Sequence, residues 1–123
     1  KTPTHKLSQY SVRFAATSSS SYGYFAGGDI GPGIVICTID RLDFSTETVT
    51  TPGPQLSQAR HKLSATSSSS YGYFGGGDPE VSPGSSIIDR LDFSTETTSV
   101  PTPKLSAARR ELAATSGLAV TNK

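Results

Sequence analysis

Apolar and polar residues alternate in short runs along this chain, and glycine, proline or serine separates the runs. Near the middle of the chain, Tyr71 and Tyr73 fall on one side of an extended backbone, and Gly72 and Phe74 fall on the other. A period of two residues, interrupted by turn-forming residues, is typical of antiparallel β-strands. This pattern predicts four strands between two proline-rich segments, at residues 61–67, 71–77, 87–93 and 97–100.

The whole pattern repeats with a period of 49 residues. Leu7, Leu56 and Leu105 each begin an "LS" step, and more than half of the positions between the first two steps recur after the second. Periods of roughly 20–50 residues indicate repeat architectures, whose units bury their faces against one another. We therefore divide the chain into a first unit at 1–55, a second unit at 56–104 and a partial third unit at 105–123.

Four antiparallel strands in a unit of about 50 residues match one blade of a β-propeller. The sequence thus predicts an all-β fold of antiparallel four-stranded blades, with about 2.5 blades in this chain. Residues 105–114 could instead form a helix with Ser106 as its N-cap. The repeat favours for these residues the conformation of their counterparts at 56–65.

The number of blades has a consequence for assembly. A propeller closes as a ring of about four to eight blades. This chain has too few, so apolar sheet faces and strand edges would be left exposed. We therefore expect self-association, or further blades of the same polypeptide.

The blade pattern resembles the kelch repeat, in which an aromatic residue precedes a diglycine, a hydrophobic–Asp step follows, and an arginine opens the next blade. The matching residues are Tyr24 with Gly27 and Gly28, Tyr73 with Gly76 and Gly77, "LDFSTET" at 42–48 and 91–97, and "LSQAR" and "LSAAR" at 56–60 and 105–109. The resemblance implies a kelch-like β-propeller. Three features depart from it. The chain has no tryptophan, Ser11 stands where Arg60 and Arg109 occur, and the third unit lacks the "YGYFGGG" segment. The repeats also resemble degenerate kelch-like repeats of phage and microbial predicted proteins, which implies an extracellular or virion-associated protein.

Composition excludes several classes of function. The 123 residues suit one domain, and 33% of them are hydrophobic. A formal net charge of +1 gives no electrostatic case for binding nucleic acid. No apolar run approaches the roughly 20 residues of a transmembrane helix, so no membrane span is expected. Cys37 is the only cysteine, and its apolar neighbours predict a buried filling role.

The sequence lacks the motifs of enzyme, metal and nucleotide sites. No G-x-S-x-G nucleophile elbow occurs, and "GGGD" at 75–78 lacks the lysine of a phosphate-binding loop. His5 and His61 have no counterparts in the neighbouring unit, and two isolated histidines do not make a metal-ligand set. We therefore expect no catalytic residue, no bound metal and no cofactor.

The repeated carboxylates indicate turns rather than acid–base chemistry. Asp40 and Asp43 are three residues apart and recur in the second unit, but positions three apart face opposite sides of a strand. Hydrogen bonding in turns and ladders is the better interpretation. Asp29 and Asp78 follow the glycines directly, where carboxylates suit a hard cation, so a calcium role remains an alternative for them.

The tyrosines are the best candidates for contact with a ligand. Tyr22, Tyr24, Tyr71 and Tyr73 lie beside small polar residues, and aromatic rings in such a setting commonly stack on sugars. The alternative is that these rings pack between blades, with their hydroxyls hydrogen-bonded.

These observations favour a non-enzymatic structural or adhesion module of a virion, such as a phage fibre or appendage, or of another extracellular assembly. A lectin-like propeller that binds a glycan is one alternative. A fragment of a propeller enzyme whose site lies on other loops is a second alternative, because fold does not determine function.

Overall fold

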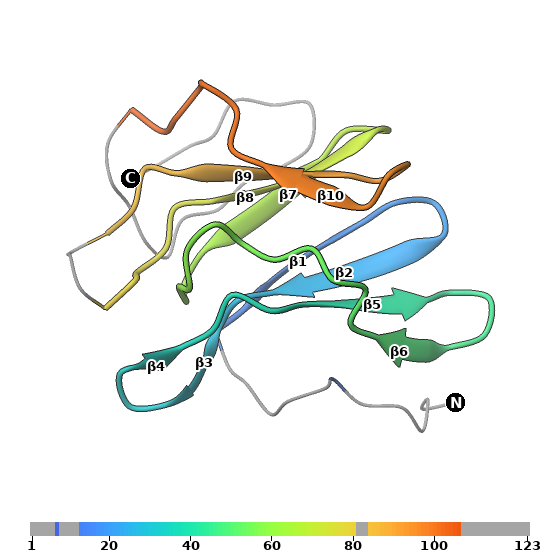
Figure 1. Cartoon of the computed structure of the whole chain (residues 1–123), viewed down its shortest axis with the longest axis horizontal. Helices are drawn as coiled ribbons and strands as arrows, with labels where there is room; N and C mark the ends of the chain where they lie inside the picture. Colours follow the sequence, from blue (N-terminus) through green and yellow to red (C-terminus); the bar gives the residue numbers. More distant parts are fainter. Residues whose placement is uncertain (1–6, 8–12, 81–83, 107–123) are drawn as a thin grey trace.

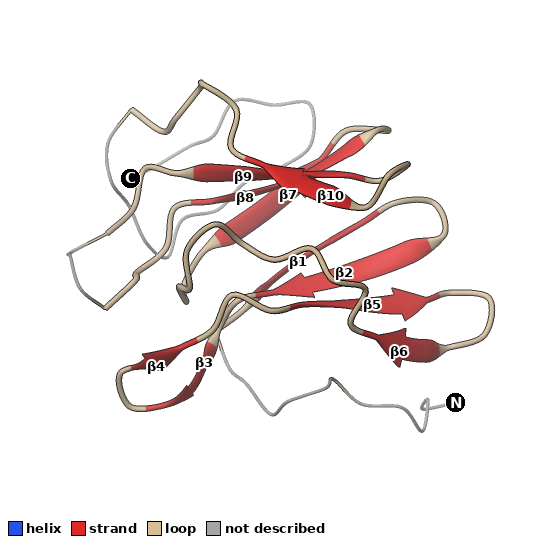
Figure 2. Ribbon diagram, in the orientation of Figure 1, coloured by secondary structure: helices blue, strands red, loops and turns tan. Residues whose placement is uncertain are grey.

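The computed structural model describes Leu7, residues 13–80 and residues 84–106. All regular structure within these residues is β-strand (Figure 2), arranged as two four-stranded antiparallel sheets and a two-stranded hairpin. No helix of the described residues has the length and apolar character needed to cross a membrane. The expectation of an all-β fold with a four-stranded antiparallel sheet in each unit is therefore confirmed for the first two units. The partial third unit and the alternative helix at 105–114 lie largely outside the described residues.

The two sheets are built alike. The first has the strand order β1-β2-β5-β6, with β1 (Ala15–Ser18), β2 (Tyr22–Ala26), β5 (Ile39–Asp43) and β6 (Thr48–Thr50). The second has the order β7-β8-β9-β10, with β7 (Ser64–Ser67), β8 (Tyr71–Gly75), β9 (Ile88–Asp92) and β10 (Thr97–Ser99). Each strand of the second sheet thus lies 49 residues after its counterpart in the first.

The repeat extends to register and turns. Tyr24 is paired with Arg41 across β2 and β5, and Tyr73 is paired with Arg90 across β8 and β9. The serine-rich turns close in the same way, because the Oγ of Ser19 accepts a hydrogen bond from the N–H of Tyr22 at 3.1 Å. Ser68 and Tyr71 repeat this contact, also at 3.1 Å. Serine suits these turns because its hydroxyl satisfies a backbone donor locally.

The observed strands are shorter than the alternation predicts, for local reasons. The strand expected at 61–67 begins only at Ser64, because Lys62 has a φ of 59° and turns the backbone out of the sheet. The strand expected at 71–77 ends at Gly75, because Gly76 and Gly77 have φ values of 73° and 98°. Alternation alone does not reveal such backbone turns.

The first unit also contains a hairpin that the sequence pattern did not predict. Between β2 and β5, the strands β3 (Asp29–Gly31) and β4 (Ile34–Val35) pair antiparallel around a turn that contains Gly33. The corresponding loop of the second unit begins at Asp78 and includes residues 81–83, which are not described. This segment between the second and third strands of the sheet is where the two units differ most in sequence.

The two sheets lie beside each other (Figure 1), and the buried side chains come from opposite faces of the two sheets. We call the side of each sheet that carries Tyr24 or Tyr73 its tyrosine face, and the side that carries Phe25 or Phe74 its phenylalanine face. The buried apolar side chains come from the tyrosine face of the first sheet and from the phenylalanine face of the second, with two from the segment that joins the units: Ala15, Tyr24, Ala26, Ile39, Phe74, Leu91, Leu56 and Leu63. Burial of a large apolar side chain contributes about 1.5–3 kcal/mol, so this interface is the main source of stability.

The sheets approach each other most closely at their first strands. β1 lies against β7 and β8 (Figure 1), and the Oγ1 of Thr17 donates a hydrogen bond to the carbonyl of Thr66 at 3.2 Å. These two threonines are equivalent positions of the repeat. The contact therefore joins one unit to the next at matching places.

Glycine is required where the segment joining the units crosses the first sheet. Gly27 has a φ of +72°, and a Cβ atom there would lie 2.6 Å from the carbonyl oxygen of Arg60. That distance is well inside van der Waals contact, so no side chain fits. The diglycine thus lets the opening segment of the second unit pass directly over the end of β2.

A buried ion pair fixes this opening segment to the second sheet. Arg60 and Asp89 are 0% and 1% exposed, and their charged groups lie 3.2 Å apart. Arg60 also donates to the carbonyl of Phe74 at 3.0 Å, and Asp89 accepts from the N–H of Ser57 at 3.1 Å. Burial lowers the pKa of Arg60, and the charge of Asp89 opposes that effect. The arginine that opens the second unit thus has a structural role.

Candidate functional site

Tyr24 and Tyr73 occupy equivalent positions, yet only Tyr24 is fully buried. The ring of Tyr24 stacks on that of Phe93 from the second unit, with centroids 5.6 Å apart and planes 10° apart. Tyr73 is partly exposed, because its sheet face has no described sheet beyond it. Position in the array, rather than residue type, decides the environment of each tyrosine.

The same contrast recurs on both faces. Ile39 on the tyrosine face of the first sheet is buried, whereas the equivalent Ile88 of the second sheet is partly exposed. On the phenylalanine faces the order is reversed, since Leu91 is buried and the equivalent Leu42 is partly exposed. Each sheet therefore buries a different face, as in a head-to-tail stack.

A charged residue completes the contact between the units. Glu96 accepts a hydrogen bond from the hydroxyl of Tyr24 at 3.0 Å and forms an ion pair with Arg41. Burial, together with the hydrogen bond to Glu96, raises the pKa of Tyr24 well above its usual value. The hydroxyl therefore stays protonated and remains a donor across the physiological range. Glu96 has a φ of 54°, in the turn between β9 and β10.

Both outer faces carry the residues that make this contact. The tyrosine face of the second sheet presents Tyr73 and Arg90, which repeat Tyr24 and Arg41. At the opposite end of the pair, Phe44 and Glu47 repeat Phe93 and Glu96, and the Phe44 side chain is 47% exposed. The Oγ1 of Thr66 is buried and has no hydrogen-bond partner within the described part of the chain. The two ends are therefore chemically complementary.

The four tyrosines considered for ligand contact do not form one site. Tyr24 lies between the sheets, and Tyr73 lies on the outer face of the second sheet. Tyr22 and Tyr71 do come together, because both line a surface groove of about 420 Å³ with the serine turns of the two units. The guanidinium group of Arg41 lies 4.6 Å from the ring centroid of Tyr22, and that of Arg90 lies 4.7 Å from the ring centroid of Tyr71. Each ring therefore already has a cation on one of its two faces.

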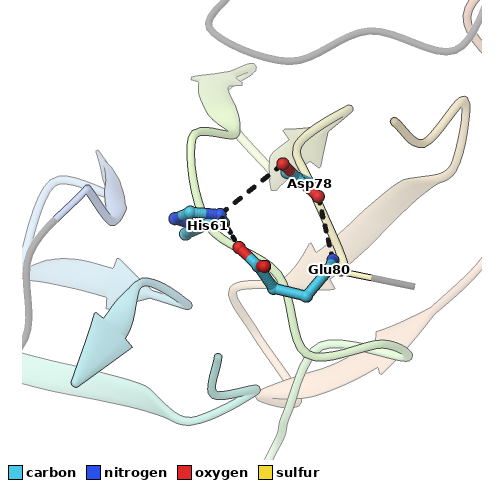
Figure 3. Close-up of side chains that lie close together, drawn as sticks. All are labelled: His61, Asp78 and Glu80. Atoms are coloured by element: carbon cyan, nitrogen blue, oxygen red, sulfur yellow. Dashed lines mark hydrogen bonds and ion pairs between the residues drawn. The ribbon is translucent and has the colours of Figure 1, made fainter. Parts of the chain in front are cut away.

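A cluster of titratable groups lies at the start of the second unit. His61, Asp78 and Glu80 converge there (Figure 3), and one potential ligand atom from each lies within 4.8 Å of the others. The Nε2 atom of His61 is 2.7 Å from the Oε2 of Glu80 and 3.7 Å from the Oδ2 of Asp78. Backbone hydrogen bonds in both directions between His61 and Asp78 hold two of these residues together.

The other side of the imidazole faces the first unit. The Nδ1 atom of His61 lies 3.3 Å from the Oδ1 of Asp29 and 3.3 Å from the Nε of Arg13. Arg13 donates to both carboxylate oxygens of Asp29, at 3.1 and 2.7 Å. Burial acts to raise the pKa of Asp29, but the hydrogen bond and charge of Arg13 hold it below its usual value. Asp29 and Asp78, considered for calcium, thus lie on opposite sides of one histidine.

The sequence contains a signal for this cluster, but the signal can be recognised only once the fold is known. The sequence pattern does not single out Glu80 or Arg13, and it predicts that His61 is an isolated histidine. His61 and Glu80 both depart from the repeat, since Val12 and Gly31 occupy the equivalent positions. Departures from a repeat that meet in space mark a local function or contact, and the fold is needed to see that they meet.

The remaining carboxylates have the structural roles expected of them. The Oδ1 of Asp43 accepts hydrogen bonds from the N–H and the hydroxyl of Ser45, at 2.8 and 2.7 Å. The hydrogen bond from the Ser45 hydroxyl lowers the pKa of Asp43. Asp40 accepts from the hydroxyl of Thr51 at 2.8 Å. Cys37, expected to be buried, is only partly so and packs against the edge of the core.

Comparisons with known proteins assign no family to this chain. No family model matches it, and no curated protein matches it either.

Proposed function

We propose that this protein is a non-enzymatic, kelch-like β-propeller module that serves as a structural or adhesive part of a virion or another extracellular assembly. The observation that carries the proposal is the packing of the tyrosine face of one unit on the phenylalanine face of the next. Contact between two different surfaces can be repeated indefinitely, and it produces a ring when the rotation between units closes.

The wedge-like arrangement of the sheets supports a propeller over a flat stack. The first strands of the two sheets lie closest together, with β1 against β7 and β8. Further out, the aromatic rings of Tyr24 and Phe93 separate the sheets. Blades that converge on their first strands are arranged about an axis, as in a propeller. Further units come from a second copy of the chain or from the same polypeptide.

A lectin-like module is the second candidate, and the groove beside Tyr22 and Tyr71 favours it. The groove has aromatic rings and serine hydroxyls, which suit the apolar faces and hydroxyls of a sugar. A propeller enzyme is the third candidate. Its site would lie on other loops, because fold does not determine function.

Sedimentation velocity over a wide concentration range tests the assembly role. We expect the sedimentation coefficient to rise with concentration, because the exposed ends associate. A compact monomer at every concentration would contradict the proposal. A glycan array separates the candidates, since saturable binding of one sugar class that Tyr71→Ala abolishes would favour the lectin.

A further inference from the structure

Two residues that break the repeat meet beside a residue that keeps it. Asp78 repeats Asp29, whereas His61 and Glu80 have no counterpart of their kind in the first unit. The first unit builds the same four-stranded sheet without them, so the fold does not require a histidine or a glutamate at these places. Their convergence on Asp78 (Figure 3) therefore calls for a separate explanation.

The imidazole is buried, and its Nε2 atom is directed at two carboxylates. The His61 side chain is 5% exposed, and Nε2 makes no hydrogen bond within the described residues. Nε2 lies 2.7 Å from the Oε2 of Glu80 and 3.7 Å from the Oδ2 of Asp78, at ion-pair distances. Buried charged groups in proteins are paired or coordinate metals, so this convergence suits a cation.

Asp29 supplies the outer contact that metal-binding histidines usually have. Its Oδ1 lies 3.3 Å from the Nδ1 of His61. A carboxylate on one imidazole nitrogen holds the proton there and leaves the other nitrogen with a free lone pair. The Nε–H of Arg13 is shared between the Oδ1 of Asp29, at 3.1 Å, and the Nδ1 of His61, at 3.3 Å. Metal binding at Nε2 requires the tautomer in which Nδ1 donates to Asp29 and the Arg13 Nε–H donates to Asp29 alone.

The charge and the atom types identify the class of ion. Arg13 compensates Asp29, whereas Asp78 and Glu80 place two further carboxylates around the Nε2 atom of His61. One imidazole and two carboxylates suit zinc and related divalent transition metals, at about 2.0–2.2 Å per ligand. Calcium takes six to eight oxygen ligands and does not favour imidazole.

We propose that His61, Asp78 and Glu80 bind one divalent transition-metal ion of the zinc class, with Asp29 as a positioning residue. Three protein ligands leave one position of a tetrahedral zinc site for water or another ligand. The ion links the opening segment of the second unit to the loop that follows β8. This inference is independent of the propeller assignment, because all of its residues lie within or beside the two described sheets.

Zinc binding by the full chain tests the proposal. The protein is treated with chelator, dialysed and titrated with ZnCl₂ in a calorimeter, and bound metal is measured after gel filtration. We expect one equivalent of zinc, and we expect Glu80→Gln to weaken binding by at least about 10-fold. Glu80 is exposed, so this variant should keep its fold. His61→Asn should abolish binding, and Asp29→Asn should weaken it by about 10–100-fold.

Matched controls separate this site from other carboxylates and from the second histidine. Glu47→Gln and His5→Gln should bind zinc as the parent chain does. Absence of zinc binding, equal binding by Glu80→Gln and Glu47→Gln, or binding of calcium in place of zinc would each overturn the proposal.

Discussion

The ring of Tyr24 lies almost parallel to the ring of Phe93, although the two residues belong to different units of the repeat. The equivalent of Phe93 in the first unit is Phe44, which no described ring covers. Phe93→Ala should therefore lower the free energy of unfolding by about 2–3 kcal/mol, through lost burial and lost aromatic contact. Phe44→Ala should cost under about 1 kcal/mol. Urea denaturation of dilute protein measures both, and equal losses would contradict the asymmetry of the two ends.

The buried pair Arg60–Asp89 should behave as a unit. Arg60→Met leaves the Asp89 carboxylate buried without its cation, which should destabilise the protein by about 3–5 kcal/mol. The double variant Arg60→Met with Asp89→Leu should recover most of this loss, because both charges are then removed. A double-mutant cycle from denaturant unfolding gives the coupling. Additive effects of the two substitutions would show that the pair is not coupled in the folded state.

Two equivalent turns give a pH test with its own internal control. A hydrogen bond from the Ser94 hydroxyl lowers the pKa of Asp92, as Ser45 does for Asp43. Because the folded pKa lies below the usual 3.8, this stabilisation is present above about pH 4 and is lost as pH falls through the folded pKa. Ser94→Ala should raise the pKa of Asp92 and leave that of Asp43 unchanged. Carboxyl NMR titrations measure both, and a shift at neither or at both would contradict this assignment.

Two glycines with the same backbone angle separate strain from collision. Gly27 and Gly33 both have a φ of +72°, but only Gly27 lies against another backbone, at Arg60. Gly33→Ala should cost about 1–2 kcal/mol, the strain of a left-handed alanine. Gly27→Ala should cost several times more, because the added Cβ meets the Arg60 carbonyl oxygen. Thermal unfolding followed by circular dichroism compares the two variants. Similar unfolding midpoints would contradict the predicted collision, because the segment at Arg60 would then move away from residue 27 at little cost.

Much of the fold could be predicted because the repeat carries it. Alternation at 71–77 and the recurring turns predict the strand type and the four strands of each sheet, since side-chain period and turn chemistry are local properties. The different burial of Tyr24 and Tyr73 could not be predicted, because identical residues in identical local structure differ only in what lies beyond their sheet. That difference is a property of the array.

The candidate metal site was harder to predict for a related reason. The spacing between His61 and Glu80 matches no recognised metal-ligand motif. Their approach depends on positive φ values at Lys62 and Glu80. Such conformations are uncommon for residues other than glycine and are set by the surrounding loops. The hairpin of β3 and β4 escaped prediction similarly, because its strands are too short to show alternation.

The outer tyrosine face of the second sheet should bind the outer phenylalanine face of the first sheet in another copy, as the two inner faces bind each other. By analogy with Glu96 and Arg41, Glu47 of one copy should meet Arg90 of another. Glu47→Arg and Arg90→Glu should each prevent self-association, because like charges then face each other across the contact.

Mixing these two variants tests the claim most directly. In the mixture, every contact between one variant and the other joins opposite charges again, so sedimentation velocity should show association restored toward that of the parent chain. Mixtures that stay monomeric, or single variants that associate as the parent does, would contradict head-to-tail packing of the units.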